Sequence, residues 1–255
     1  MKKLATFLLI LLWFLPTGLS AQDEEVEVEH NPKNFIKTNI TSIILTNNYS
    51  FQYERVLTKR LSLGVSYRFM PESGVPKLFK GAIKSQVDED DDYETQVLDK
   101  LNMSNTAITP ELRFYLGKGY GRGFYIAPYY RYAKFDISGY NLQFDKEDGS
   151  QGEVKISGDF TSHSGGIMFG AQWALGKYVV LDWWILGAHF GSATGSLHGR
   201  SDENLSIIDQ QNIKDEIEDF EFFDKVTVVD EHNVKVDVSG PWAGIRMGIS
   251  LGIRF

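Results

Sequence analysis

The stretch GIRMGISLGIRF, residues 244–255, decides the fold. Every second position from Ile245 to Phe255 carries an apolar side chain, and the positions between them carry only glycine, serine or arginine. This alternation is typical of a β-strand, because successive side chains of a strand point to opposite faces. One apolar face and one small or charged face suit a strand between membrane hydrocarbon and a polar interior. The stretch therefore predicts the last strand of a transmembrane β-barrel.

The start of the chain predicts export. Lys2 and Lys3 precede an apolar run over residues 4–15, and the small residues Ser20 and Ala21 follow. The run has about 12 residues, fewer than the roughly 20 that a spanning helix needs, so a cleaved signal peptide is favoured over an uncleaved anchor. We expect a signal peptide at residues 1–21 and a flexible acidic segment at residues 22–34.

Composition excludes several classes of protein. The formal net charge of −8 argues against a nucleic-acid partner, since such binding needs a basic face. The chain has no cysteine, which excludes a disulfide framework and the acylated cysteine of a lipoprotein. Beyond the signal peptide, no stretch reaches the roughly 18 apolar residues of a spanning helix, so any membrane integration must come from strands. We expect a single barrel domain over residues 35–255.

Alternation and turn residues predict eight strands. The expected strands occupy about residues 35–45, 49–57, 61–70, 106–116, 124–137, 161–175, 178–190 and 238–255. The second, fourth and sixth strands are followed by short turns, and the third, fifth and seventh by insertions at about 71–105, 139–159 and 192–236. Outer-membrane barrels have short periplasmic turns and longer outer loops. We therefore predict an all-β fold, an eight-stranded antiparallel transmembrane β-barrel with long outer loops. A soluble barrel of the lipocalin type would not explain why the long connections fall at one end.

One choice of face for each strand turns nearly all its charged side chains toward the interior. These residues are Lys37, Glu54, Arg68, Glu111, Arg113, Arg131, Asp182 and Arg246. An eight-stranded barrel has room only for its own side chains, and an unpaired buried charge is strongly destabilising. We therefore expect these groups to pair with one another as a plug. The alternative is a narrow ion channel.

Aromatic residues near the ends of the strands predict the belts that flank the hydrocarbon region. They are Tyr129, Tyr130, Trp173, Trp183, Trp184 and Trp242. Such belts are general in outer-membrane barrels, so we prefer this interpretation to stacking on a sugar or a cofactor.

Two histidines offer the only catalytic hypothesis. His163 and His189 share outward parity on neighbouring strands near the outer rim, and Ser192 lies close to His189 in the sequence. A lipid-facing histidine and serine would suit an outer-leaflet lipid-modifying enzyme, a lipid A deacylase or acyltransferase. A serine nucleophile needs a histidine that a third group orients, and the sequence identifies no such group. We therefore expect interfacial histidines and no catalytic activity.

Two polar insertions carry further features. Asp88, Asp90 and Asp92 could ligate Ca²⁺, but the run lacks the ligand spacing and the turn glycine of an EF-hand, so we expect a solvated loop and no cofactor. In the last insertion, apolar residues at helical spacing from Leu205 to Phe220 predict a short amphipathic helix. We expect it to pack within the loops rather than to form a partner surface.

Four runs carry a resemblance to a known family: FQYERV at 51–56, PELRFYL at 110–116, GAQW at 170–173 and GPWAGIR at 240–246. They resemble a family of uncharacterised outer-membrane barrels of Gram-negative bacteria, domain of unknown function 3575, and more distantly the small OmpA/OmpX type. The resemblance implies an outer-membrane protein of structural or surface-interaction type, surrounded by lipid and lipopolysaccharide. It also implies that Phe255 is recognised by the barrel-assembly machinery, and it brings no reaction, ligand or surface partner.

Overall fold

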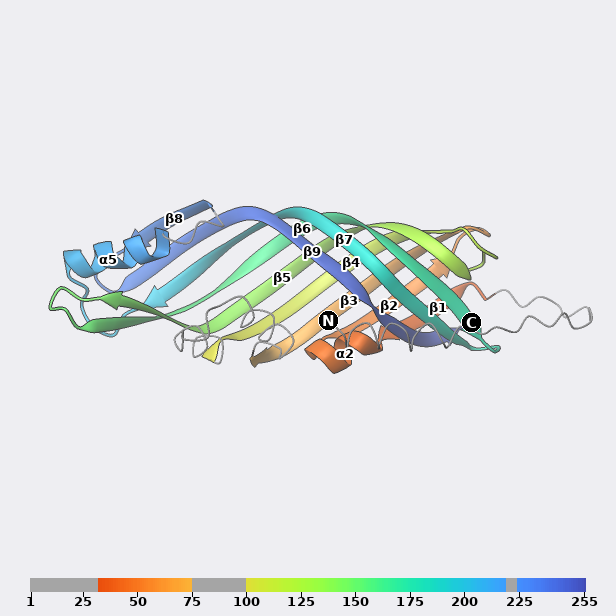
Figure 1. Cartoon of the computed structure of the whole chain (residues 1–255), viewed down its shortest axis with the longest axis horizontal. Helices are drawn as coiled ribbons and strands as arrows, with labels where there is room; N and C mark the ends of the chain where they lie inside the picture. The colour runs from red at the N-terminus through yellow and green to blue at the C-terminus, as the bar shows by residue number, and fades with distance from the viewer. Residues whose placement is uncertain (1–31, 75–99, 219–223) are drawn as a thin grey trace, which may run out of the picture. The chain divides into compact units, whose positions relative to one another are not determined.

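The computed structural model describes residues 32–74, 100–218 and 224–255 (Figure 1). This part of the chain is mostly β. Its elements are β1 (Asn34–Asn39), α2 (Ile40–Thr46), β2 (Tyr49–Val56), β3 (Leu61–Gly74), β4 (Asn102–Tyr115), β5 (Gly123–Asp145), β6 (Gln151–Leu175), β7 (Val179–Arg200), α5 (Ile207–Glu218), β8 (Asp224–Val229) and β9 (Asn233–Arg254). Neither of these helices has the length and apolarity needed to cross a membrane. The predicted signal peptide and most of the acidic segment at 22–34 lie outside the described residues.

The nine described strands form one antiparallel sheet in the order β1-β2-β3-β4-β5-β6-β7-β9-β8. Because β1 also pairs with β9, eight of these strands make a hydrogen-bonded ring, from which β8 is excluded. The ring closes where Asn34 and Phe255 exchange two backbone hydrogen bonds of 3.0 Å. Along β9, the apolar side chains from Ile245 to Ile253 are exposed on the outer face, whereas Arg246 and Ser250 are buried. The predicted alternation of the last strand is confirmed.

Four strands continue well beyond the ends that the sequence predicted. Much of the expected loops at 139–159 and 192–236 is in fact regular sheet: β5 and β6 pair as far as Asp145 and Gln151, and β7 pairs with β9 as far as Arg200. In Figure 1 these strands reach past β1–β4 toward α5 and β8. We call this part the sheet extension, residues 139–159, 194–200 and 224–239 together with α5.

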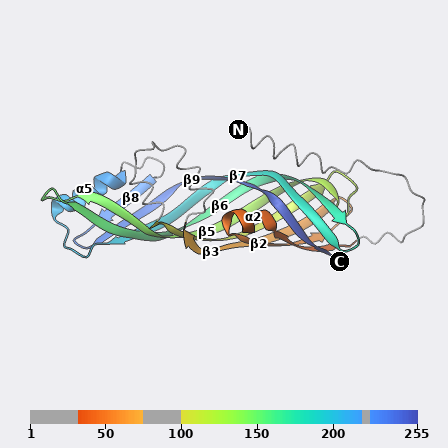
Figure 2. The same ribbon diagram turned by 60° about the horizontal axis from the view of Figure 1, so that its bottom comes forward.

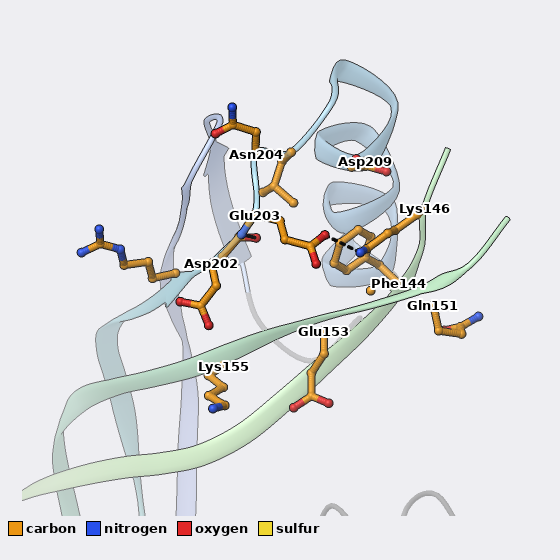
Figure 3. Close-up of a pocket in the computed structure, with 13 residues that line it drawn as sticks. Phe144, Lys146, Gln151, Glu153, Lys155, Asp202, Glu203, Asn204 and Asp209 are labelled. Atoms are coloured by element: carbon orange, nitrogen blue, oxygen red, sulfur yellow. Dashed lines mark hydrogen bonds and ion pairs between the residues drawn. The ribbon is translucent and has the colours of Figure 1, made fainter. Parts of the chain in front are cut away.

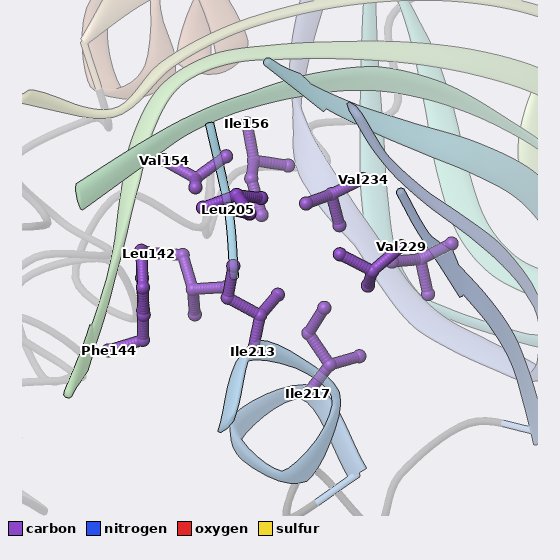
Figure 4. Packing of buried hydrophobic residues seen from close by; sticks show 10 residues of the cluster. Leu142, Phe144, Val154, Ile156, Leu205, Ile213, Ile217, Val229 and Val234 are labelled. Atoms are coloured by element: carbon purple, nitrogen blue, oxygen red, sulfur yellow. The ribbon is translucent and has the colours of Figure 1, made fainter. Parts of the chain in front are cut away.

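The sheet extension has a hydrophobic core of its own (Figure 4). Ile213 and Ile217 of α5 are buried against Leu142, Phe144 and Val154 of the β5–β6 hairpin. Burial of this apolar area explains why segments rich in polar residues continue as strands. The predicted helix and its packing within the loops are confirmed for Leu205, Ile213 and Ile217, whereas Ile208 of the expected apolar stripe is exposed and Phe220 lies outside the described residues.

A capping box begins α5. The Ser206 hydroxyl accepts a hydrogen bond from the Asp209 backbone N–H at 3.1 Å, and the Asp209 carboxylate accepts one from the Ser206 N–H at 2.9 Å. The same carboxylate accepts the N–H of Glu147, in the turn between β5 and β6, at 2.9 Å. Beside it, Lys146 and Glu203 form an ion pair of 2.5 Å at a cavity of about 310 Å³ (Figure 3). Asp209 thus joins the helix to the hairpin.

Replacing Asp209 by alanine is expected to loosen α5. Burial raises the pKa of the Asp209 carboxyl, but the N–H groups of Ser206 and Glu147 outweigh burial and hold the pKa below its ordinary value. A lowered folded-state pKa means that the carboxylate stabilises the fold above the unfolded value of about 3.9, and that this contribution is lost as the pH falls through the folded value. At pH 6 we expect amide exchange in α5 to be roughly fivefold faster in Asp209→Ala. Equal exchange at pH 6 would contradict this role.

The first predicted strand is wrong in its second half. Instead of continuing to residue 45, the chain leaves the ring after Asn39 and forms α2 (Figure 2). The Asn39 side chain caps this helix by accepting the Ser42 N–H at 2.9 Å, and Asn47 ends it in the left-handed conformation with φ 52°. Thr41 attaches the helix to β9, since its hydroxyl accepts the Ile249 N–H at 3.0 Å. The ring is therefore closed by a strand of only six residues.

Candidate functional site inside the strand ring

Arg113 lies at the centre of the ring interior and is completely buried. Its guanidinium donates to Glu111 at 2.5 Å, to Asp182 at 2.7 Å and to Glu54 at 3.2 Å. It also donates to the side-chain oxygen of Gln52 at 3.0 Å. Three strands supply these carboxylates. One guanidinium can reach all of them because their inward positions lie at the same level in the ring. A single arginine thus links strands β2, β4 and β7.

Lys37 of β1 completes this network. Its ammonium group lies 2.6 Å from Glu54, 2.7 Å from Asp182 and 2.6 Å from the amide oxygen of Gln172. All three side chains are fully buried. We call Lys37, Glu54, Glu111, Arg113 and Asp182 the ion-pair plug.

Aromatic side chains enclose the ion-pair plug. Tyr115 donates its hydroxyl to Glu54 at 2.7 Å, and Tyr125 donates its hydroxyl to Asp182 at 2.8 Å. The Arg113 guanidinium lies 4.3 Å from the centre of the Tyr125 ring. Charge-assisted hydrogen bonds and a fully buried cation–π contact are the conditions under which buried ions are retained. The structure thus brings five of the eight predicted interior charges into one bonded group.

The other three interior charges, Arg68, Arg131 and Arg246, form a second group that we call the guanidinium cluster. Arg68 donates to the Asn105 side chain at 2.9 Å, and Arg131 donates to the Thr109 hydroxyl at 3.2 Å. Neither has an ion-pair partner among the described residues. The expectation that all interior charges pair with one another is therefore wrong for these two arginines.

Arg246 is the member of the guanidinium cluster closest to the plug. Its guanidinium packs on the rings of Tyr129 and Trp184, at 4.7 and 4.8 Å from their centres. The Glu111 carboxylate is 3.7 Å away, too far for a hydrogen bond. Aromatic faces therefore provide much of its local stabilisation.

His189 faces the interior, so its predicted outward position is wrong. A β-bulge lies between Trp184 and Gly187, where Ile185 and Leu186 together oppose one residue of β9. The extra residue reverses the face of every later side chain in β7. The His189 ring then fits over Gly244, where a Cβ atom would lie 2.6 Å from the imidazole Nε2. His163 and His189 consequently do not meet.

His163 lies on the outer face, as predicted, between the rings of Tyr130 and Tyr132. The Tyr130 hydroxyl is 2.5 Å from the imidazole Nδ1. Ser192 of β7 is the direct register partner of His163 in β6, and both residues are exposed. In the described part of the chain, no hydrogen bond joins the two. The sequence did not identify Tyr130 as a hydrogen-bond partner of His163, because it comes from a third strand, β5.

The predicted aromatic belts are correct in part. Tyr130, Trp173 and Trp183 are turned outward. Trp242 shares the inward face of β9 with Gly244 and Arg246 and packs against the rings of Phe135 and Phe160, so its predicted place in an outer belt is wrong. Tyr129 and Trp184 are buried inside the ring instead. They serve as the faces on which Arg246 packs.

The aspartates proposed as Ca²⁺ ligands, Asp88, Asp90 and Asp92, lie outside the described residues. Among the residues that are described, no group of three or more histidines and carboxylates could hold a metal ion. Phe255, the predicted handle for assembly, is exposed at the end of the chain beside Asn34.

Comparisons with known proteins agree with the resemblance seen in the sequence. No curated protein matches the chain. One family model matches residues 7–193, a range that includes β1 to β6 and most of β7. It covers the strands that supply the ion-pair plug. The chain therefore belongs to the family described as "Protein of unknown function (DUF3575)".

Proposed function

We propose that the ring is an eight-stranded β-barrel that spans the bacterial outer membrane without conducting ions or catalysing a reaction. In this proposal the chain is exported by a cleaved signal peptide, and lipid and lipopolysaccharide surround it. The sheet extension stands outside the membrane and contacts a surface partner. The assembly machinery recognises the end of the chain at Phe255.

The observation that carries this proposal is the inverted distribution of polarity across the ring. Ionised groups are buried inside, whereas large apolar side chains cover the outer face. They include Ile36, Phe51, Tyr53, Leu63, Val65, Ile108, Phe114, Ile167, Phe169, Ile245, Met247, Ile249, Leu251 and Ile253. A soluble protein rarely exposes such a continuous apolar surface. Hydrocarbon around the ring would remove this surface from water.

Strand β6 supports an outer boundary for the hydrocarbon region. Its exposed residues in the sheet extension are polar and include Glu153, Lys155 and Asp159. Its exposed residues from Ile167 to Leu175 are mostly apolar. A spanning strand needs about 9–11 residues, which fits the apolar part alone. The sheet extension would then lie in water.

The plug supports the absence of conductance, and planar bilayers test it. Because Arg113 and its partners fill the ring at one level, the purified protein is expected to give no sustained channels. Sustained single-channel steps from the unmodified protein would contradict this part of the proposal. A Glu111→Ala variant serves as a positive control, since removal of one carboxylate opens space beside Arg113 and is expected to give at least transient current.

A second function is favoured by one specific observation, the grouping of Ser192, His163 and Tyr130 on the outer face. In this alternative the Ser192 hydroxyl attacks an ester carbonyl of an outer-leaflet lipid and gives its proton to His163. The ester C–O bond breaks as His163 returns the proton to the departing alcohol, which leaves an acyl-serine; water then hydrolyses the acyl-serine and restores Ser192 with release of a free fatty acid. Tyr130 would hold the imidazole through Nδ1, as the orienting group of such sites does.

Lipid analysis separates the two functions. Mass spectrometry is performed on lipid A from cells that produce the protein, the Ser192→Ala variant or the matched Thr194→Ala variant. The proposal of a non-catalytic barrel predicts the same acylation in all three. Loss of one acyl chain that depends on Ser192 but not on Thr194 would establish the enzyme instead.

A further inference from the structure

We propose that the guanidinium cluster is a binding site for the acidic head group of an amphiphile, a phosphate or carboxylate that carries an alkyl chain. The alkyl chain would leave the ring through a break between β9 and β3. This inference rests on the proposed membrane location, because hydrocarbon around the ring supplies such a molecule.

The ring has a break in its strand pairing next to α2. Strand β1 pairs with β9 only as far as Asn39 and Ser250, and β8 joins β9 only as far as Ser239. Among the described residues, no strand pairs with β9 on this side between Gly240 and Ile249. On the other side of the break, β3 continues past Phe69, the last of its residues that pairs with β2. Helix α2 borders the break but does not replace the missing ladder.

A cavity of about 580 Å³ lies at this break. All three arginines of the guanidinium cluster line it, together with Asn105 and Trp184. Apolar side chains line the rest and include Leu45, Met70, Leu101, Met103, Ile245 and Met247. Ile245 and Met247 belong to the outer face of β9, where they are 67% and 60% exposed. The cavity thus connects an apolar outer surface to a cationic interior.

The arginines have donors that no described group uses. The Nε atom of Arg68 and the Nη1 atom of Arg246 are buried without a hydrogen-bond partner. Burying a donor without a partner is unfavourable, and more so when the donor is charged. Oxyanions match guanidinium donors in geometry and in charge. An acidic head group in the cavity would satisfy these donors.

The interior charges do not balance without such a group. Five cations face the interior, Lys37, Arg68, Arg113, Arg131 and Arg246, against three carboxylates, Glu54, Glu111 and Asp182. Counted over the described residues, the interior therefore carries two positive charges in excess. The ion-pair plug already contains all three carboxylates, so the excess lies on the guanidinium cluster. A phosphate monoester carries a charge between −1 and −2 near neutral pH and compensates most of this excess.

The apolar lining selects an amphiphile rather than a small ion. A cavity for phosphate alone would not need the methionines and aliphatic side chains that lead to the outer face. Methionine adapts its shape to flexible apolar ligands. An alkyl chain that passes between Met103 and Met247 would bury these side chains and keep the head group on the arginines.

Binding of dodecyl phosphate to the purified full chain in non-ionic detergent tests the inference. Binding is measured as a saturable rise in thermal midpoint on titration, with each variant compared to its own ligand-free midpoint. We expect the unmodified protein to bind dodecyl phosphate, and the Arg68→Gln/Arg131→Gln variant to bind at least tenfold more weakly. The matched variant Arg55→Gln/Arg60→Gln, which removes two exposed arginines, is expected to bind like the unmodified protein.

Inorganic phosphate and dodecanol separate the two halves of the ligand. Each is expected to give less than a tenth of the affinity of dodecyl phosphate. If inorganic phosphate binds as tightly as dodecyl phosphate, the ligand is not an amphiphile. If the Arg68→Gln/Arg131→Gln variant binds dodecyl phosphate as tightly as the unmodified protein, the guanidinium cluster is not the binding site. If that variant does not fold, the single variant Met103→Glu, which adds a negative charge to the cavity lining, is expected to abolish binding of dodecyl phosphate. Carbonate extraction of membranes is scored separately, so failure of the membrane proposal is distinguishable from failure of the site.

Discussion

Replacing Arg113 by methionine is expected to lower the free energy of unfolding by about 3–5 kcal/mol. The substitution leaves Glu54, Glu111 and Asp182 buried with only Lys37 as a cation in the plug. Methionine occupies a similar volume, so the loss reports on charge rather than on a cavity. Urea unfolding of the protein in lipid vesicles, followed by tryptophan fluorescence, measures the change.

Arg55→Met is the matched control for Arg113→Met. Arg55 is exposed on β2 and, within the described residues, bonds to the Asn34 side chain alone, at 2.7 Å. An exposed contact of this kind contributes roughly 0–1 kcal/mol. If the two variants lose equal stability, the plug does not hold the ring together.

Replacing Val65 by arginine is expected to lower the free energy of unfolding in lipid vesicles by about 2–4 kcal/mol. Val65 is 43% exposed on the outer face of β3, beside the level of the ion-pair plug. In hydrocarbon, the guanidinium would lose its hydration without gaining a partner. The variant is compared with the unmodified protein by the same urea unfolding.

Val226→Arg is the corresponding change in the sheet extension. Val226 is 65% exposed on β8, which the proposal leaves in water. An exposed substitution of this kind changes stability by no more than about 0.5 kcal/mol. A Val65→Arg variant as stable as Val226→Arg would mean that no hydrocarbon surrounds the ring.

The ring and the faces of its strands could be predicted from the sequence because both depend on a period of two. Once Ile245 and Arg246 of the last strand are assigned to opposite faces, charges such as Glu54, Arg113 and Asp182 indicate the interior face of the other strands. These three charges are buried at one level because of the register between the strands, and the lengths of the turns determine that register. The aromatic run in β5 was less informative, because Tyr129 and Tyr130 are alike in the sequence and lie on opposite faces.

The position of His189 could not be predicted. The bulge that turns it inward lies within Trp183-Trp184-Ile185-Leu186, four apolar residues in which alternation is not visible. Inside the ring, Trp184 packs on Arg246, and outside it Ile185 and Leu186 face the same way. Only the cross-strand register reveals the extra residue.

Two other errors had signals in the sequence. Leu142, Phe144, Val154 and Ile156 alternate on both sides of the turn that joins β5 and β6, but their Gly- and Asp-rich surroundings favoured a loop. Asn39 and Asn47 flank α2 as helix-capping residues, although Ile43 and Leu45 also fit a strand. In both places tertiary packing decides between two locally acceptable structures.

The division of the interior charges into two groups depends on three-dimensional distances. Arg68 and Arg113 are equivalent in the pattern, yet only Arg113 lies among carboxylates. Residues such as Met70 and Asn105, which complete the cavity, carry no sequence signal of their own.

The location of the ring in a membrane is the central claim, and the accessibility of single cysteines tests it most directly. The natural chain has no cysteine, so Val65→Cys, Phe169→Cys and Val226→Cys each introduce one thiol. The proteins are incorporated into lipid vesicles and treated with a charged, water-soluble maleimide. We predict that Val226→Cys reacts at least tenfold faster than the other two, which react only after the vesicles and the fold are disrupted. Equal reaction of all three in intact vesicles would contradict a membrane-spanning ring.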